Sequence, residues 1–349
     1  MASAEYVIVG SGLTGSVIAR ELADAGRSVL VLERRDTVGG NCSDIVNHGI
    51  RMNLYGPHYF RTSSDAIWEY VQRFSEFIPF EAVVKSCVNG HIYDWPITQE
   101  MVDMYPKVTS LDNPANFEEA CLSRIPKPLY EKLIRGYTER QWGKSAKDMD
   151  KSLASRIEIR QGNDRRLSTK KYQGVPKDGY TNWIQKMLDG IPVQLGVNYL
   201  ETREEYQARK LLVFTGAIDS LFRHDLGHLQ YRSQLRTNTY FENTEWRLPA
   251  CQINYPGMGD SILREIEWKH IWLSDTKGTL ITAEMPISGG EEYPVPDKAN
   301  QVLYQRYRNR VDSTDRLLVE GRMGRNRYQD MDESIARALK IAREIIRDK

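Results

Sequence analysis

The sequence lacks long apolar runs, closely spaced cysteines and an excess of charge of either sign. Its four cysteines, Cys42, Cys87, Cys121 and Cys251, lie far apart and form no CxxC pair. We therefore expect neither a disulfide scaffold nor a zinc site, and no other metal site. No segment approaches the roughly 18 apolar residues that a membrane-spanning helix needs, and the first residues lack the pattern of a signal peptide. These absences are consistent with a protein of the reducing cytoplasm that has no membrane contact.

The charges of the chain are nearly balanced. Lys and Arg number 48 against 47 Asp and Glu, for a net charge of +1. No field of one sign extends over the chain to attract nucleic acid, so we expect no nucleic-acid partner. An anionic ligand would have to be bound by a local group of cations.

The N-terminal segment predicts a β-α-β unit. The apolar run Tyr6–Val9 is followed by the glycine-rich segment Gly10–Gly15, by a helical pattern that ends near Gly26, and by the buried-strand run Val29–Leu32.

The glycine-rich segment GSGLTG fits the dinucleotide fingerprint GxGxxG. Gly10 permits a tight turn, Gly12 lets the backbone approach a pyrophosphate, and Gly15 allows close packing of the helix on the strand. The helix N-terminus would then face the negative charge of a cofactor.

A carboxylate and a second glycine pair follow this fingerprint. Glu33 ends the second strand, about 20 residues on, where it would accept hydrogen bonds from an adenosine ribose. Gly39 and Gly40 come next, a pattern known from FAD-dependent proteins. We therefore interpret the cofactor as FAD rather than a nicotinamide.

The rest of the chain changes character several times. Residues 64–150 have an amphipathic helical pattern, and residues 156–178 are polar and strongly basic, which is typical of a linker or a mobile functional loop. Buried strands are expected at residues 211–216 and 315–324, with alternating antiparallel strands between them and a C-terminal helix over Met331–Arg347.

At 349 residues the chain is roughly twice the usual domain size of about 150 residues, so we expect two or three packed units. The predicted fold class is α/β: a Rossmann-like FAD-binding domain with an inserted helical subdomain and an antiparallel β-sheet subdomain. The FAD-binding domain would be discontinuous, over residues 1–75, 189–218 and 300–349. The helical subdomain would span residues 76–150. The sheet subdomain would comprise residues 151–188 and 219–299, with a mobile substrate loop near residues 160–173.

Six segments, in order along almost the full length of the chain, resemble motifs of the UDP-galactopyranose mutases. They are YGPHYFRT (Tyr55–Thr62), GYTERQWGKSAKD (Gly136–Asp148), YQGVPKDGYT (Tyr172–Thr181), ILREIEWKH (Ile262–His270), EYPV (Glu292–Val295) and GRMGRNRYQDM (Gly321–Met331). The second of these similarities is long and specific, and chance agreement at six ordered places is negligible.

This resemblance implies an FAD enzyme, an isomerase, that interconverts the pyranose and furanose forms of a nucleotide-diphosphate galactose without net redox change. In that family the flavin is reduced, and its N5 atom attacks the anomeric carbon while the nucleotide diphosphate leaves. The resemblance also implies a cytoplasmic homodimer that supplies galactofuranose for cell-surface polysaccharide biosynthesis.

The resemblance assigns site residues as well. Catalytic roles are expected for His58, Arg61, Arg264, Tyr293, Tyr328 and Asp330. Substrate binding is expected for Tyr137, which would stack on the uracil ring, and for Trp142, Lys171, Tyr172, Tyr180, Asn254, Arg264, Tyr293 and Tyr328. Together with the fingerprint, it predicts cofactor binding by Gly10, Gly12, Leu13, Thr14, Gly15, Glu33, Arg34, Gly40, Asn41, Tyr55, Gly56, His58, Thr215, Gly216, Arg322, Asp330 and Met331.

The chain departs from the family pattern at two positions. Arg61 stands where the family has a second histidine, which replaces a largely neutral imidazole with a permanent cation that has five donors. We therefore hypothesise an altered substrate, such as a sugar with an N-acetyl group at C2 or another nucleotide. Lys171 stands where the family places an arginine, so the phosphate clamp would lose a bidentate fork, for which Arg165 or Arg166 could compensate.

Several alternatives stay open. The same chemistry on UDP-N-acetylgalactosamine or a dTDP-hexose differs only in the substrate. A flavin oxidoreductase similar to the amine oxidases would share the FAD fold, and so would a noncatalytic binding protein similar to the GDP-dissociation inhibitors. The intact glycines and Glu33 argue against a scaffold that has lost its flavin.

Overall fold

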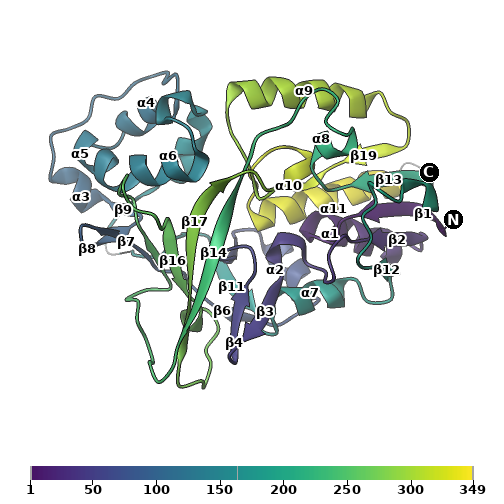
Figure 1. Ribbon diagram of the computed structural model, residues 1–349, viewed down its shortest axis with the longest axis horizontal. Helices are drawn as coiled ribbons and strands as arrows, with labels where there is room; N and C mark the ends of the chain where they lie inside the picture. The colour runs from purple at the N-terminus through teal and green to yellow at the C-terminus, as the bar shows by residue number, and fades with distance from the viewer. Residues whose placement is uncertain (1, 163, 348–349) are drawn as a thin grey trace.

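The computed structural model describes residues 2–162 and 164–347 and confirms the predicted α/β class. A five-stranded sheet and a seven-stranded sheet organise these residues. Figure 1 shows the five-stranded sheet near both chain termini, the seven-stranded sheet in the middle of the molecule and a group of helices at the opposite end.

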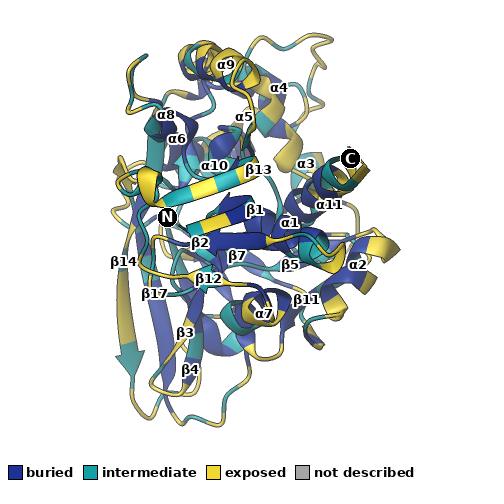
Figure 2. Ribbon diagram, turned by 90° about the vertical axis from the view of Figure 1, so that its right-hand side faces the viewer, coloured by how far each residue is buried: buried dark blue, intermediate teal, exposed yellow. Residues whose placement is uncertain are grey.

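The five-stranded sheet is parallel throughout. Its spatial order is β12 (Val193–Gln194), β2 (Val29–Leu32), β1 (Ala2–Val9), β13 (Tyr206–Phe214) and β19 (Leu317–Val319). The strand β2 is buried along its whole length, as its continuous apolar run predicts, and it is dark blue in Figure 2. The helices α1 (Leu13–Asp24) and α11 (Met331–Arg347) pack together and share one core with this sheet.

The turn between β1 and α1 requires glycine. Gly10 has a φ of 101°, in the region that favours glycine. A Cβ atom added to Gly15 would lie 2.0 Å from the carbonyl oxygen of Gly10, so only glycine lets α1 approach the strand this closely. The predicted Rossmann-like β-α-β unit is confirmed, and its turn lies at the carboxyl edge of the parallel sheet.

The seven-stranded sheet carries the alternating segments of the sequence. Its spatial order is β18 (Tyr293–Pro294), β14 (Tyr231–Phe241), β17 (Thr279–Ser288), β16 (Arg264–Glu267), β15 (Gln252–Asn254), β7 (Val84–Val88) and β8 (His91–Trp95). Neighbouring strands are antiparallel, except that β15 and β7 are parallel. The long strands β14 and β17 extend away from the helices in Figure 1.

The prediction of helix from residue 76 onward is wrong for its first part. Residues 77–98 form the strands β6 (Phe77–Pro79), β7, β8 and β9 (Ile97–Thr98). Asn89 and Gly90 form the turn between β7 and β8 with φ values of 51° and 79°, and an Asn-Gly pair is a strong hairpin signal. The Asn-Gly pair thus predicts a hairpin here, whereas the amphipathic pattern of the residues that follow favours helix for the whole segment.

The helical group begins only at residue 99. It consists of α3 (Gln99–Asp103), α4 (Phe117–Leu122), α5 (Lys127–Tyr130), a π-helical turn (Glu131–Arg135) and α6 (Gly136–Trp142). Its buried side chains, such as Phe117, Tyr130 and Trp142, form a core separate from that of the parallel sheet.

The remaining elements connect these parts. They are β3 (Asp44–Asn47), β4 (Ile50–Asn53), β5 (Phe60–Thr62), α2 (Asp65–Gln72), β10 (Ile159–Arg160), β11 (Tyr172–Pro176), α7 (Gly179–Met187), α8 (Ile218–Leu221), α9 (Lys298–Asp312), α10 (Gly321–Gly324) and 3-10 turns at Gly40–Cys42, Ala146–Asp148, Lys151–Arg156, Arg203–Glu205 and Trp268–His270. Although we expected α7 in the sheet subdomain, its Trp183 and Ile184 belong to the same core as Ile18 of α1. No helix of the described residues is long and apolar enough to cross a membrane.

Candidate active site

A cavity of about 1060 Å³ opens at the carboxyl edge of the parallel sheet. Its walls come from all three parts of the fold: the glycine turn, the helix α6, and the strands β15, β16 and β18. Ligands of open α/β sheets bind at this edge, and the volume is at the upper end of ordinary ligand pockets. The cavity is therefore large enough for more than one small ligand.

One half of the cavity is built for a dinucleotide. Glu33 is buried, and its Oε2 atom accepts hydrogen bonds from the Ser11 amide (2.8 Å) and the Ser11 hydroxyl (2.7 Å). A Cβ atom added to Gly12 would meet the Cα atom of Gly40 at 3.9 Å, so the two glycine backbones lie close together at the wall. A fixed carboxylate beside an open glycine turn fits the ribose and pyrophosphate of a dinucleotide.

The segment Tyr55–His58 lies next to this cradle and is fixed by hydrogen bonds. The His58 amide donates to Asn53 at 3.2 Å, and the ring nitrogen Nδ1 lies 2.8 Å from the carbonyl oxygen of Gly56. Burial lowers the pKa of His58 to about 4, and nearby cations such as Arg322 add to this effect. His58 is therefore a neutral imidazole at pH 7.

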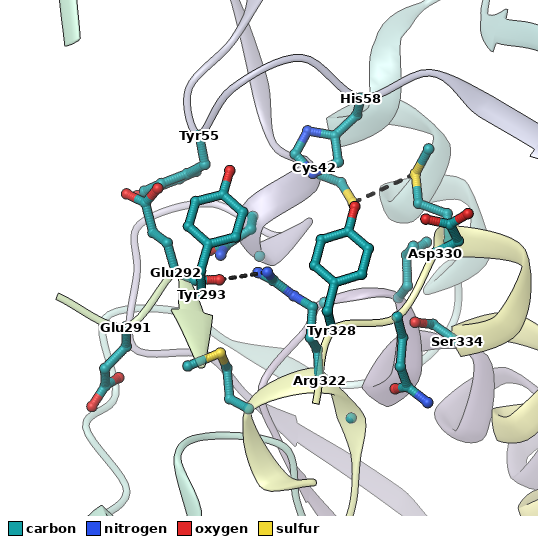
Figure 3. Close-up of a pocket in the computed structure, with 18 of the residues that line it drawn as sticks. Cys42, Tyr55, His58, Glu291, Glu292, Tyr293, Arg322, Tyr328, Asp330 and Ser334 are labelled. Carbon is teal, nitrogen blue, oxygen red and sulfur yellow. Dashed lines mark hydrogen bonds between the residues drawn. The ribbon is translucent and has the colours of Figure 1, made fainter. Parts of the chain in front are cut away.

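Two phenols and a guanidinium line the same cavity as the cradle. Figure 3 shows Arg322 between Tyr293 and Tyr328, with His58 beyond Tyr328 and Asp330 beside it. The Arg322 guanidinium lies 5.6 Å from the Tyr293 ring centroid and donates to the Glu292 carbonyl oxygen. Burial raises the pKa of Tyr293, so its hydroxyl stays protonated and able to donate.

A second group of cations surrounds Asp330. Arg61 contacts its carboxylate at 3.3 Å, and Lys170 at 3.7 Å. Arg156 lies over the Tyr328 ring, 3.7 Å from its centroid. Burial alone would raise the pKa of Asp330, but Arg61, Arg156 and Lys170 outweigh it and lower the pKa below its ordinary value.

Aromatic and amide side chains complete the wall. Trp142 meets Tyr293 edge to face, with ring centroids 6.4 Å apart, and Tyr137 lines the cavity from the same helix, α6. Asn254 accepts a hydrogen bond from Gln252 at 2.8 Å and lies directly opposite Arg264 across the sheet. A planar base and a sugar could both contact this wall.

Most of the predicted site residues line one cavity. From the predicted cofactor set these are Gly10, Gly12, Leu13, Thr14, Gly15, Glu33, Arg34, Gly40, Asn41, Tyr55, His58, Thr215, Gly216, Arg322, Asp330 and Met331. From the predicted catalytic and substrate sets these are Arg61, Tyr137, Trp142, Asn254, Arg264, Tyr293 and Tyr328.

Lys171 and Tyr172, which are predicted to bind the substrate, stand outside the residues that line the cavity. Lys171 pairs with exposed Asp65 at 2.7 Å, and the Tyr172 hydroxyl donates to the same carboxylate while its ring stacks on Trp68. The preceding residue, Lys170, lines the cavity, whereas Lys171 does not.

Tyr180 and Gly56 also stand outside the residues that line the cavity. Tyr180 is fully buried, and its hydroxyl donates to the His58 carbonyl oxygen at 2.9 Å, so it supports the wall from behind. Gly56 has a φ of 85°, and an added Cβ atom would lie 2.9 Å from Glu284, so this glycine makes room for a buried ion pair.

Four cationic residues that line the cavity were not predicted: Arg35, Arg156, Lys170 and Arg223. Arg156 and Lys170 line the cavity, whereas Arg165 pairs with Asp94 and Arg166 with Glu81, so neither of the latter compensates at the site. The strongly basic composition of this stretch was the available signal, but it did not distinguish one arginine from another.

Within the described ranges, Asp219, His224 and His228 lie close enough together to hold a metal ion. Asp219 already accepts hydrogen bonds from the Leu229 amide, the Tyr231 hydroxyl and the His224 ring. We interpret this group as a hydrogen-bonded turn.

The glycine turn, the parallel sheet and the cavity define a Rossmann-type protein with a site for a flavin-type dinucleotide. Residues 8–74 match the family model of the NAD(P)-binding Rossmann-like domain, and residues 132–328 match the family model described as UDP-galactopyranose mutase. The chain therefore belongs to the UDP-galactopyranose mutase family, whose members are isomerases.

Individual relatives agree with this placement. A Klebsiella pneumoniae protein named probable UDP-galactopyranose mutase is 32% identical over 99% of this chain and 96% of its own length. The dTDP-fucopyranose mutase of Escherichia coli is 29% identical over 99% of each chain. A crystal structure of reduced UDP-galactopyranose mutase superposes with a TM-score of 0.77 over 99% of this chain and 94% of that one, and at 14% identity it shows the fold alone.

Proposed function

We propose that this chain is an FAD-dependent mutase that interconverts the pyranose and furanose forms of UDP-galactose or a close analogue. The observation that supports this most is one cavity that is lined both by the dinucleotide cradle around Glu33 and by Arg322, Tyr293 and Tyr328. An oxidoreductase would need the cradle but has no evident use for a clamp of cations and phenols.

Reduced FAD, when bound, supplies a nucleophilic ring nitrogen for the anomeric carbon of the sugar. The chain's own residues control the leaving group. A departing nucleotide diphosphate carries roughly two negative charges and must be kept for recapture, which cations and phenol hydroxyls achieve. Arg264, Arg322 and Arg156 supply the charge, and Tyr293 and Tyr328 supply the hydroxyls.

The remaining wall would orient the nucleotide and the sugar. We assign Tyr137 to stacking on the base, and Trp142 and Asn254 to the sugar side. Because Nδ1 of the neutral His58 donates to the Gly56 carbonyl oxygen, its Nε2 atom can accept one hydrogen bond beside the flavin without adding charge to a site that already holds several cations. Each of these residues would orient the nucleotide or the sugar. The sugar atoms that react would then stay close to one another while the ring opens and recloses.

A second candidate substrate has a specific observation in its favour. Arg61 lies in the cavity wall as half of an ion pair with Asp330, so the sugar side carries a fixed cation and anion. Such a pair can bond an extra polar substituent, for example an N-acetyl group at C2 of the sugar. A dTDP-hexose is the other candidate, because one relative is a dTDP-fucopyranose mutase.

The test is direct. The purified protein is reduced with dithionite and incubated separately with UDP-galactose, UDP-N-acetylgalactosamine and a dTDP-hexose, and the products are analysed for furanose forms. The proposal expects a yellow protein that converts at least one of them only when reduced. Oxygen consumption with an amine would favour an oxidase, and a colourless protein that cannot be loaded with FAD would favour a binding scaffold. We further propose that the protein is a cytoplasmic homodimer, which size-exclusion chromatography would test for the oligomeric state. We also propose that its product serves polysaccharide synthesis, which deletion of the gene would test.

A further inference from the structure

Three charged residues lie in one row across the seven-stranded sheet. In the strand register, Arg236 of β14 is directly opposite Glu284 of β17, and Glu284 is directly opposite Arg264 of β16. Directly opposed residues of antiparallel strands project from the same face, so the three side chains stand next to one another. Beyond Arg264 the row continues with the uncharged Asn254, which lies opposite Arg264, and with Ser86 of β7.

The central carboxylate of this row is shared between two guanidiniums. Glu284 is fully buried, and it accepts from Arg236 Nε at 2.8 Å and from Arg264 Nε. Burial alone would raise the pKa of Glu284, but Arg264 and Arg236 outweigh it and lower that pKa. Glu284 is therefore ionised between two cations.

Arg236 uses its whole fork on protein carboxylates. Its Nη1 and Nη2 atoms donate to the two oxygens of Glu292 at 2.9 and 2.6 Å, while Nε is bonded to Glu284. Its side chain is 12% exposed, and among the described residues it stands outside the set that lines the cavity. Because Nη1 also donates to the Gln234 carbonyl oxygen at 3.3 Å, four of the five N–H groups of Arg236 are used on protein acceptors.

Arg264 is in the opposite situation. Its shortest contact with Glu284 uses Nε, so this bond does not consume the two terminal Nη groups, and Arg264 lines the cavity. If Glu284 were paired with Arg264 alone, the two charges would cancel and the carboxylate would repel an anion in the cavity. The bond from Arg236 to the other oxygen of Glu284 holds this carboxylate on the Nε side of Arg264.

The other partner of Arg236 is connected to the same clamp. The carbonyl oxygen of Glu292 accepts from Arg322, and Tyr293 is the next residue in the chain. A bidentate Arg–carboxylate pair fixes orientation as well as distance. Arg236 thus contacts the supports of both sides of the clamp, Glu284 behind Arg264 and Glu292 beside Arg322 and Tyr293.

We propose that Arg236 is a positioning residue for the diphosphate of the substrate. It holds Glu284 and Glu292 so that Arg264, Arg322 and Tyr293 face the diphosphate as one preorganised clamp, without touching the ligand itself. The inference rests on the proposed function, because it assumes that the ligand is a nucleotide diphosphate.

The test compares a ligand that has the diphosphate with one that does not. The FAD-loaded, oxidised protein is titrated calorimetrically with UDP and with uridine, as wild type, Arg236→Met and Arg236→Lys. We expect Arg236→Met to weaken UDP binding at least about tenfold and to leave uridine binding within about twofold. Arg236→Lys, which keeps the charge but loses the fork, should fall between the two. Unchanged UDP binding, or equal weakening for UDP and uridine, would overturn the proposal.

A matched control separates positioning from the general cost of breaking a buried ion pair. Arg337 forms a bidentate pair with buried Glu320, and both stand outside the described cavity lining. Arg337→Met should lower the melting temperature and keep the ratio of UDP to uridine affinity at its wild-type value. A changed ratio in this control would also overturn the proposal.

A further variant covers the case in which Arg236→Met fails to fold or to hold FAD. Glu292→Gln keeps the side-chain shape and removes one charge, and it should weaken UDP at least threefold more than uridine; an equal effect on both would overturn the proposal. Failure of the wild type to isomerise any sugar would count against the proposed function. The role of Arg236 would still be judged on UDP affinity, because it is tested by binding measurements.

Discussion

Arg61 and Asp330 are 269 residues apart in the sequence and form an ion pair at 3.3 Å in the cavity wall. The pair joins the strand β5 to the segment before α11 on the side of the cavity where the sugar is proposed to bind. Lys170 lies 3.7 Å from the same carboxylate, so the position carries more cationic charge than a histidine would supply.

Replacement of Arg61 should therefore change the sugar that is preferred. For Arg61→His we expect the ratio of kcat/KM between an N-acetylated and a plain galactose substrate to change at least tenfold, or by about 1.4 kcal/mol. Arg61→Lys, which keeps the charge, serves as the control and should change the ratio less. An unchanged preference in Arg61→His would contradict a role of this residue in specificity.

Arg156 and Lys171 make a contrasting pair of variants. Because Arg156 lines the cavity over the Tyr328 ring, Arg156→Ala should lower kcat/KM at least tenfold. Lys171 pairs with Asp65 on the surface, so Lys171→Ala should stay within about twofold of wild type. Steady-state kinetics of both variants with reduced enzyme is the measurement. A large loss of kcat/KM in Lys171→Ala and a small one in Arg156→Ala would indicate that Lys171, and not Arg156, binds the diphosphate.

The depressed pKa of His58 predicts a dependence of stability on pH. The unfolded chain binds a proton at this histidine below about pH 6.5, whereas the folded chain does so only near pH 4. Stability is therefore fully present above pH 6.5 and is lost as the pH falls towards 4, by roughly 1 to 2 kcal/mol at pH 5. Denaturant titrations of wild type and His58→Asn at pH 7 and pH 5 should show a smaller loss in the variant; equal losses would contradict the assignment.

Gly15 should be intolerant of any side chain. In Gly15→Ala the added Cβ atom would lie 2.0 Å from a backbone oxygen, so α1 must move away from the glycine turn. We expect a loss of roughly 1 to 3 kcal/mol of stability together with most of the bound flavin. Gly259→Ala is the control, because its Cβ atom would meet no described atom within 4 Å. Normal flavin content in Gly15→Ala would contradict the role of the turn.

The local features of this protein were predictable from the sequence. The glycine turn, Glu33 and the buried strand β2 depend on residues within about 30 positions of each other, and their spacing reflects one β-α-β unit. The family motifs likewise identified the residues of β16, β18 and α10 that now line the cavity.

The features that depend on register and side-chain direction were not predictable. The resemblance predicts a site role for Lys171 because it stands at the position of the family's arginine, but the sequence does not show that Lys171 pairs with Asp65 while Lys170 lines the cavity. Arg156 lies in a stretch without periodicity, so nothing distinguished it from its basic neighbours. The row of Arg236, Glu284 and Arg264 depends on the pairing of β14, β17 and β16, which is set by the folded sheet.

Furanose formation by the reduced protein tests the central claim most directly. The FAD-loaded protein, with and without dithionite, is incubated with UDP-galactose, UDP-N-acetylgalactosamine and a dTDP-hexose, and pyranose and furanose forms are separated by chromatography. The account predicts that at least one furanose product forms in the reduced sample and that none accumulates in the oxidised one. A reduced, fully flavin-loaded protein that leaves all three substrates in the pyranose form would contradict it.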